Sequence, residues 1–91
     1  MKVVHCKRQD YDVYIGRPSI FGNPFSVMEY GRKGAIEKYR QYFHQRILED
    51  QGFKEEVLKL KGKILGCFCA PRPCHGDIII EYLKKENQNG E

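Results

Sequence analysis

Two short apolar segments begin the chain. Residues 2–6 are apolar and β-branched, and residues 11–16 alternate, with Val13 and Ile15 on one side and Tyr14 on the other. Both patterns are typical of β-strands. The polar residues between the two segments are typical of a turn, so the strands, if they are neighbours, would pair antiparallel.

Three longer stretches predict helices, and a fourth predicts a strand. Apolar residues recur at helical spacing over residues 32–50, a shorter helix is expected over 53–60, and a final helix is expected over 75–85. Residues 63–69 form an apolar run that predicts a buried strand, which Pro71 must end because proline lacks the backbone donor. The apolar stripe of the long helix consists of Ile36, Tyr39, Phe43 and Ile47.

The order strand, strand, helix, helix, strand, helix predicts an α/β fold. We expect a single domain over residues 1–86 and a disordered tail over residues 87–91. The stretch from Tyr11 to Cys69 holds a strand, a helical crossover and a strand, which is the order of a right-handed parallel βαβ unit. The sequence therefore predicts a small Rossmann-like sheet in two or three layers.

A parallel pair of strands has a consequence for the loops that follow them. Parallel strands end at the same edge of a sheet, where open α/β folds bind ligands. The loop of residues 17–25 and the loop of residues 70–77 should therefore face each other across a cleft. The final helix would point its amino terminus, which attracts anions, into the same cleft.

Length and composition limit the class of protein. The chain has 91 residues, 41% of them hydrophobic, with no run typical of a membrane span or a secretory signal, so we expect a cytoplasmic protein. Thiols stay reduced in that compartment, and the four cysteines favour metal binding, catalysis or burial over disulfides. The net charge of +4 is compatible with an anionic partner but is common in small proteins without one.

Polar side chains of the two loops are the candidates for ligand binding. Arg17 and Arg72 would hold negative charge, and Ser19 and Asn23 would position a ligand beside Cys69. Together with the helix terminus, they favour an anionic small molecule of the nucleotide or phosphorylated-sugar type. In the alternative interpretation both arginines are solvated loop residues, and Ser19 and Asn23 only satisfy the backbone of a turn.

The stretch CFCAPRPCHGD concentrates side chains that carry chemistry. Cys74 stands at a helix start, where a thiol pKa is lowered; His75 offers a base, and His75 or Asp77 would handle a proton. Alternatively, Cys67, Cys69, Cys74 and His75 would bind zinc, although a C-x-C pair is tight for a tetrahedral ion. A third interpretation makes Cys67 and Cys69 small apolar residues of a buried strand.

Two compound motifs, IGRPSIFGNPF and CFCAPRPCHGD, occur in this order on either side of the long helical segment. In these motifs, and over most of its length, the chain resembles the domain-of-unknown-function family 4326, which is found in bacteria and phages. The resemblance implies an architecture related to small Rossmann-like nucleotide-binding proteins, and no settled activity. It also adds Gly16 and Gly76, which lie within the motifs, to the expected ligand-binding residues.

The sequence thus predicts a small Rossmann-like protein that binds an anionic nucleotide-type or phosphorylated small molecule at the loops after its parallel strands. Whether it hydrolyses or transfers a glycosidic or phosphate bond, and so is an enzyme, is left open. The alternative is a zinc-stabilised binding module whose basic face contacts nucleic acid or a host protein. A homodimer that buries aromatic surface is compatible with either interpretation.

Overall fold

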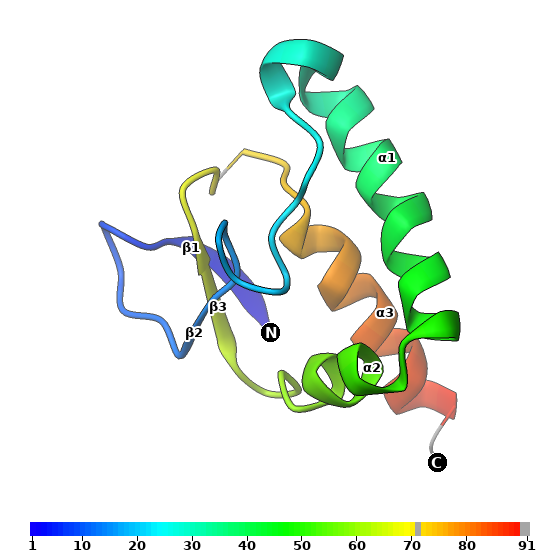
Figure 1. The fold of residues 1–91 in the computed structure, drawn as a ribbon. Helices are drawn as coiled ribbons and strands as arrows, with labels where there is room; N and C mark the ends of the chain where they lie inside the picture. The colour runs from blue at the N-terminus through cyan, green and yellow to red at the C-terminus, as the bar shows by residue number, and fades with distance from the viewer. Residues whose placement is uncertain (71, 90–91) are drawn as a thin grey trace.

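The computed structural model describes residues 1–70 and 72–89 (Figure 1). Within these residues it holds a three-stranded sheet and three helices, so the fold is mixed α/β, as the sequence predicts. No helix in these two ranges is both long enough and apolar enough to cross a membrane. In chain order the elements are β1 (Lys2–His5), β2 (Val13–Tyr14), α1 (Val27–Glu49), α2 (Gln51–Leu58), β3 (Ile64–Cys67) and α3 (Gly76–Asn89).

The three strands are parallel and lie in the order β1-β3-β2. Leu65 of β3 pairs with Val3 of β1 on one side and with Val13 of β2 on the other. The parallel βαβ unit is confirmed, because β2 and β3 are neighbours joined through α1 and α2. The antiparallel pairing considered for β1 and β2 does not occur, since β3 lies between them; residues 65–67 of β3 are all buried, as a central strand requires.

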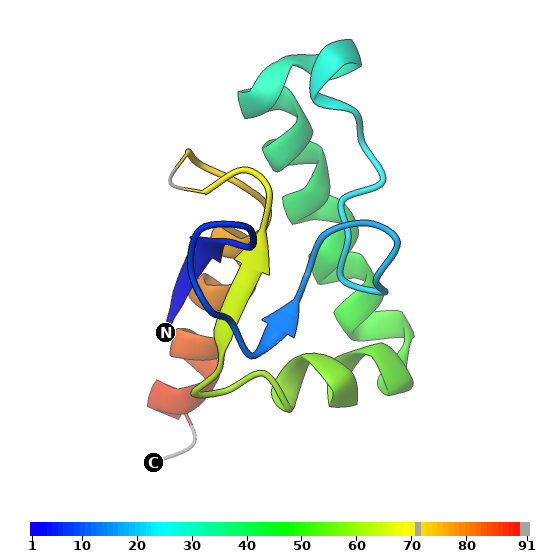
Figure 2. The same ribbon diagram turned by 90° about the vertical axis from the view of Figure 1, so that its left-hand side faces the viewer.

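The link between β1 and β2, residues 6–12, crosses β3 on the face of the sheet opposite the helices (Figure 2). The ring of Tyr11 packs against Gly66, where an added Cβ would lie 2.6 Å from the Tyr11 Cγ. Asp12 then fastens the link, because its carboxylate accepts a hydrogen bond from the Ile64 N–H at 2.7 Å. The sheet therefore has helices on one face and a packed loop on the other, which makes two layers.

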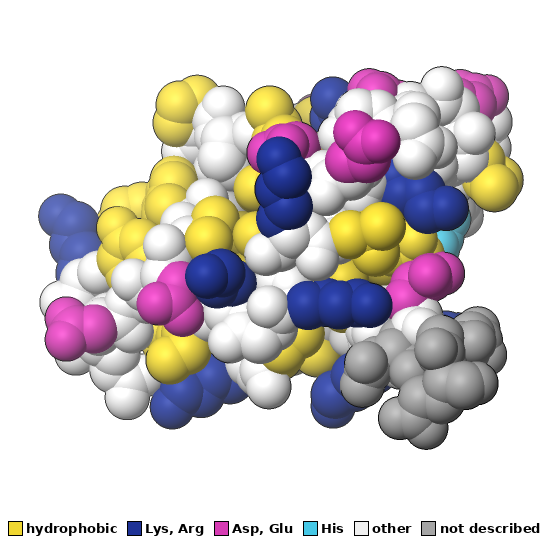
Figure 3. Space-filling model, turned by 90° about the horizontal axis from the view of Figure 1, so that it is seen from below, with side chains coloured by type: hydrophobic (Ala, Val, Ile, Leu, Met, Phe, Trp, Pro, Cys, Tyr) yellow, Lys and Arg dark blue, Asp and Glu magenta, His cyan; other side chains and the backbone are white. Residues whose placement is uncertain are grey.

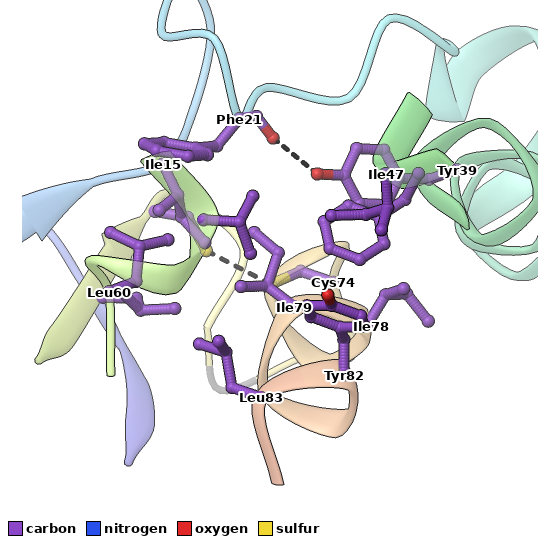
Figure 4. Close-up of a cluster of buried hydrophobic side chains, with 14 of the residues drawn as sticks. Ile15, Phe21, Tyr39, Ile47, Leu60, Cys74, Ile78, Ile79, Tyr82 and Leu83 are labelled. Carbon is purple, nitrogen blue, oxygen red and sulfur yellow. Dashed lines mark hydrogen bonds between the residues drawn. The ribbon is translucent and has the colours of Figure 1, made fainter. Parts of the chain in front are cut away.

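Helix α1 supplies the largest side chains of the core. Tyr39, Phe43 and Ile47 of the predicted stripe are buried, whereas Ile36 is half-buried. Apolar residues of α3 pack against them (Figure 4). The Tyr39 hydroxyl also donates a hydrogen bond to the Phe21 carbonyl at 2.8 Å, so the loop after β2 is fastened to α1.

The helix boundaries differ from the prediction by more than two residues at two places. Helix α1 begins before residue 32, because the hydroxyl of Ser26 caps it by accepting the Met28 N–H. Gly31, at a φ of 74°, then interrupts the helical backbone, a conformation that glycine adopts readily. At the other end, α3 continues through Asn89 into the predicted tail, and residues 90 and 91 lie outside the described ranges.

Replacing Gly66 with alanine is expected to lower the free energy of unfolding by about 1–3 kcal/mol, because the added methyl group overlaps the Tyr11 ring in a packed site. Gly34→Ala is the matched control, since its Cβ would meet only the Tyr30 Cβ at 3.4 Å. In that helical site alanine should be more stable than glycine by about 0.5–1 kcal/mol. Urea unfolding followed by circular dichroism measures both variants, and a Gly66→Ala protein as stable as wild type would show that Tyr11 does not pack on β3.

Candidate functional site

A cleft of about 290 Å³ opens at the carboxyl edge of β2 and β3. The loop after β2 contributes Gly16, Arg17 and Asn23 to its lining, and the segment after β3 contributes Cys69 and Cys74. The first turns of α1 close a third side. The two loops singled out in the sequence therefore meet at one edge, as the parallel pairing of β2 and β3 requires.

Three aromatic side chains, Tyr14, Phe25 and Phe68, line this cleft. Tyr14 and Phe68 meet edge to face with ring centroids 6.0 Å apart, and the Tyr14 hydroxyl donates a hydrogen bond to the Arg17 carbonyl at 2.9 Å. Desolvation raises the pKa of Tyr14, so its phenol stays protonated and keeps this hydrogen bond. Phe68 is 55% exposed, so its ring is open to a flat ligand.

Four arginines surround the cleft and a second hollow beside it. Arg17 and Arg32 line the cleft. Arg8, Arg32 and Arg72 line the hollow, whose volume is about 260 Å³, so Arg72 lies next to the cleft rather than in it. No ion pair among the described residues involves any of the four.

His75 is buried in the lining of the cleft and joins its two sides. Its Nε2 lies 2.7 Å from the Ile15 carbonyl oxygen, so Nε2 carries the proton and donates. The ring of Tyr39 meets the imidazole edge to face, with centroids 5.0 Å apart. Burial lowers the pKa of His75, and the imidazole is therefore neutral near pH 7. The Nε2–H of His75 therefore has a structural role, and Nδ1 is the ring nitrogen that is left to accept a hydrogen bond.

Cys67 and Cys74 are buried together in the lining of the cleft, with their Sγ atoms 3.4 Å apart. The Cys74 thiol donates a hydrogen bond to Cys67, and backbone N–H groups of Cys69 and Ala70 also favour the Cys67 thiolate, so the pKa of Cys67 falls to about 5. The pKa of Cys74 is raised, because its proton is held by Cys67 and its side chain is desolvated. The lowered pKa therefore belongs to Cys67 and not, as the sequence predicts, to Cys74.

Three polar residues proposed from the sequence are bonded to backbone. The Ser19 hydroxyl accepts the N–H two residues further on at 3.3 Å, and the Asp77 carboxylate accepts the Cys74 N–H at 3.2 Å. Asn23 donates to the Ala35 carbonyl of α1 at 3.1 Å and accepts an N–H of its own loop at 2.9 Å. Asn23 lines the cleft, whereas Ser19 and Asp77 do not. For Ser19 and Asn23, these contacts favour the alternative interpretation, in which they satisfy the backbone of a turn.

Gly16 and Gly76 are places of close approach. A Cβ on Gly76 would lie 2.7 Å from both the Ile15 Cδ1 and the Val3 Cγ2, so α3 begins this near the sheet only with glycine there. A Cβ on Gly16 would lie 2.6 Å from the Tyr14 Cζ. Gly16 lines the cleft and Gly76 does not. Both glycines therefore have a packing role that their motif positions alone do not reveal.

The alternative zinc ligands, Cys67, Cys69, Cys74 and His75, do not form a metal site. Within residues 1–70 and 72–89, no three histidine, cysteine or acidic side chains are placed to hold one ion. The imidazole Nε2 of His75 is turned to the Ile15 carbonyl, and the Cys67 and Cys74 sulfurs contact each other. The geometry therefore does not support the zinc-stabilised module.

Sequence reasoning missed Arg32 and the three aromatic residues of the cleft. The position of Arg32 depends on the break at Gly31, after which its Nη1 donates to the Pro73 carbonyl at 3.3 Å. Phe68 did give a signal: it is a large side chain between two cysteines, and alternation along the strand places it on the opposite face from Cys67. An aromatic residue that a buried strand turns outward is a candidate for ligand contact.

The family model described as "Domain of unknown function (DUF4326)" matches residues 2–85. The chain is 37% identical over 84 residues to a protein of Enterobacteria phage T4 described as "Uncharacterized 12.4 kDa protein in nrdA-td intergenic region", an alignment that covers 92% of this chain and 78% of that protein. No solved structure matches the chain. Neither description states a ligand or a reaction, so the function has to be argued from the cleft.

The buried, neutral His75 predicts a pH dependence of stability. Its pKa in the folded chain lies below the unfolded value of about 6.5, so the unfolded state binds the proton first and stability falls as the pH drops below about 6.5. Between about pH 7 and pH 5.5, the wild type should lose more stability than His75→Gln, by at most about 1 kcal/mol, because the glutamine amide is still able to donate to Ile15 but does not titrate. Denaturant unfolding at both pH values measures the difference.

The comparison isolates His75, because Cys67 contributes a slope of the same sign to both proteins. Its lowered pKa gives stability that is present above the unfolded pKa and is lost as the pH falls toward about 5. His44→Gln, which removes an exposed histidine, is the matched control. Equal slopes in wild type and His75→Gln would contradict a neutral, buried imidazole.

Proposed function

The chain belongs to the DUF4326 family, and we propose that it binds an anionic, nucleotide-type small molecule at the carboxyl edge of its sheet. In this proposal the sheet serves as a small Rossmann-like unit, whose ligands sit at that edge. The observation that carries the proposal is the junction of an aromatic-lined cleft with an arginine-lined hollow, which share Arg32, Phe68 and Cys69. A nucleotide has the same two halves, a flat base and a charged phosphate.

The cleft suits the base of such a ligand. Its three aromatic rings offer stacking or edge contacts, and stacking of a base on an aromatic side chain contributes about 1–3 kcal/mol. The Asn23 amide and the Tyr14 hydroxyl are already bonded to backbone carbonyls, so they hold the walls in place rather than turn toward a ligand. Discrimination between bases would therefore come mainly from shape.

The hollow suits the phosphates. A guanidinium group binds phosphate oxygens through two parallel N–H donors, and Arg8, Arg32 and Arg72 all line this space. The opposite end of the molecule has a different character, because Lys and Arg side chains are interspersed with Asp and Glu there (Figure 3). Arginines that form no ion pair with any described residue are concentrated at the carboxyl edge, and this supports an anionic ligand more strongly than the net charge of +4 does.

Size favours a mononucleotide or a phosphorylated sugar. Ligand pockets commonly measure roughly 300–1,000 Å³, and the cleft and the hollow, at about 290 and 260 Å³, each lie just below that range. A dinucleotide would need a longer crevice than these two adjoining spaces provide. The proposal therefore concerns one base or sugar with its attached phosphates.

We propose binding rather than turnover. Both candidates for acid–base chemistry are already bonded to backbone: His75 lines the cleft, but its Nε2 donates to the Ile15 carbonyl and leaves only Nδ1, and the Asp77 carboxylate accepts a backbone N–H outside the cleft. General acid–base catalysis needs a titratable group within hydrogen-bond distance of the reacting atom and a pKa near the working pH. The arginines and aromatic rings meet the demands of binding without such a group.

Nucleoside diphosphates are expected to raise the melting temperature and to bind measurably in titration calorimetry, with ADP, GDP, CDP and UDP as the probes. Arg32→Gln should weaken this binding about 10-fold or more, because a charge-assisted hydrogen bond to phosphate is lost. Lys61→Gln is the matched control. It removes the same charge from an exposed turn between α2 and β3, at the far edge of the sheet, and should leave the affinity unchanged.

Two partial ligands test the division of the site. Inorganic pyrophosphate should bind weakly and lose affinity in Arg32→Gln, whereas a free nucleoside should bind weakly and keep its affinity in that variant. The melting temperature of each ligand-free variant shows whether the substitution alone changes the fold. Should no nucleotide or phosphorylated sugar shift the melting temperature, while nucleic acid binds with a steep salt dependence, the small-molecule proposal is overturned in favour of a nucleic-acid surface.

A further inference from the structure

We propose that Cys67 and Cys74 form a peroxide-reactive dithiol, in which Cys67 is the attacking thiol and the pair is oxidised to an intramolecular disulfide. The inference is independent of the proposed nucleotide binding, because it concerns the sulfur atoms and a small oxidant. It rests first on the position of the two thiols and then on the groups around them.

The two sulfur atoms are close enough to bond after a small movement. Their separation of 3.4 Å must fall to about 2.0 Å in a disulfide, a change on the order of 1 Å. Cys74 lies before α3 and outside any helix or strand, so its side chain and backbone are able to adjust without breaking regular structure. Cys67, at the end of β3, provides the fixed partner.

Access to the pair favours a small oxidant. Cys67 is 1% exposed and Cys74 is 2% exposed, but both border the cleft of about 290 Å³. A peroxide molecule is able to enter such a space, whereas a disulfide carried on another protein is too large to reach a sulfur buried to this degree. Hydrogen peroxide is therefore the reactant class that this geometry admits.

The surroundings assign different roles to the two sulfurs. The Cys67 thiolate is stabilised by the Cys74 S–H and by backbone N–H groups of Cys69 and Ala70, which keeps its pKa low and the nucleophile present at neutral pH. Cys74 keeps its proton and also accepts the Gly76 N–H at 3.3 Å, so it stands ready as the resolving thiol. The thiolate thus forms on the sulfur at the end of the rigid strand.

The oxidation proceeds in two balanced steps. In the first, the Cys67 thiolate attacks one peroxide oxygen, an S–O bond forms as the O–O bond breaks, and hydroxide leaves and takes up a proton from solvent. In the second, the Cys74 sulfur attacks the Cys67 sulfenic acid, the S–S bond forms as the S–O bond breaks, and the departing hydroxide takes the Cys74 proton to give water. Overall, two thiols lose two electrons to one peroxide.

Other charged and titratable groups also face this pair. Tyr14 of β2 lies on the sheet side, where desolvation and then negative charge on Cys6 and Cys67 raise its pKa. His75 and Asp77 lie on the side of α3, where the imidazole is neutral and the carboxylate is bonded to the Cys74 N–H. The measured reaction should be dominated by the Cys67–Cys74 contact, because it is the largest influence on both thiols.

The test maps the disulfide formed when the reduced protein meets one equivalent of hydrogen peroxide. After remaining thiols are blocked under denaturing conditions, chymotrypsin cuts the chain behind Phe68 and separates Cys67 from the other two cysteines of this stretch. A Cys67–Cys74 disulfide keeps the two fragments joined until it is reduced. The mapping is done in wild type and in Cys69→Ser, the matched control, which excludes a disulfide to Cys69.

Single variants separate the two steps. In Cys74→Ser the oxidation should stop at a sulfenic acid on Cys67 that dimedone traps, whereas in Cys67→Ser neither the trapped adduct nor the disulfide should form. Circular dichroism shows whether each variant is folded, and the wild-type mapping decides the matter should Cys67→Ser fail to fold. Cys69→Ser should be oxidised at a rate within about 2-fold of wild type, since the substitution keeps the Cys69 backbone N–H that favours the Cys67 thiolate and changes only a side chain that forms no bond in either step.

The pH dependence of the oxidation rate tests the lowered pKa of Cys67, which the proximity of two thiols alone does not establish. Between about pH 6 and pH 8 the oxidation rate of folded protein should change less than about 3-fold, whereas an ordinary thiol with a pKa of about 8.5 slows roughly 10-fold per pH unit in this range. The protein unfolded in urea provides the ordinary profile. Oxidation confined to Cys6 or Cys69, or a folded profile equal to the unfolded one, would overturn the proposal.

Discussion

The buried hydrogen bond from His75 Nε2 to the Ile15 carbonyl holds the two sides of the cleft together. The N–H of Ile15 donates in turn to the Gly66 carbonyl at 2.9 Å, so one residue connects the end of β2 both to β3 and to the segment that begins α3. Loss of this bond would leave a buried carbonyl and a buried imidazole without partners, at about 1–3 kcal/mol for each unsatisfied group. The position of the two cleft walls therefore depends on the His75 side chain.

The core is arranged around this contact. Tyr39 of α1 packs its ring against His75 and donates its hydroxyl to the Phe21 carbonyl, so a single core residue fixes both the histidine and the loop after β2. A chain of 91 residues buries a smaller fraction of its surface than a larger domain does, and has little core to spare for a separate site. The side chains that stabilise the fold and those that form the cleft are consequently in direct contact.

Much of the fold follows from local pattern and one topological rule. Apolar spacing placed α1, α2 and α3, and the order of strand, helices and strand led to parallel pairing of β2 with β3 and hence to the meeting of two loops. The central position of β3 in the sheet could not be predicted from local pattern, because β1 and β3 pair although they are far apart in the sequence. It depends on Gly66, whose missing side chain leaves room for Tyr11 to cross the sheet.

The pKa values of the two buried thiols also could not be predicted from the sequence. The position of Cys74 at a helix start favours a low pKa, but its hydrogen bond to Cys67 outweighs this effect. Cys67 and Cys74 are seven residues apart along the chain, and this spacing does not reveal that their side chains are in contact. The position of Arg32 at the cleft could not be predicted either, since it depends on a break in the helical backbone at Gly31. Both properties come from tertiary geometry, which periodicity and spacing do not encode.

The motif residues divide into those that build the cleft and those that remain available in it. Short polar side chains such as Ser19, Asn23 and Asp77 reach only the nearby backbone, and in turns the backbone takes up their hydrogen-bonding capacity. Long cations and aromatic rings extend beyond the backbone that carries them, which is why Arg17 and Phe68 border the open space. A polar residue in a loop motif is therefore a better guide to how a site is constructed than to what touches the ligand.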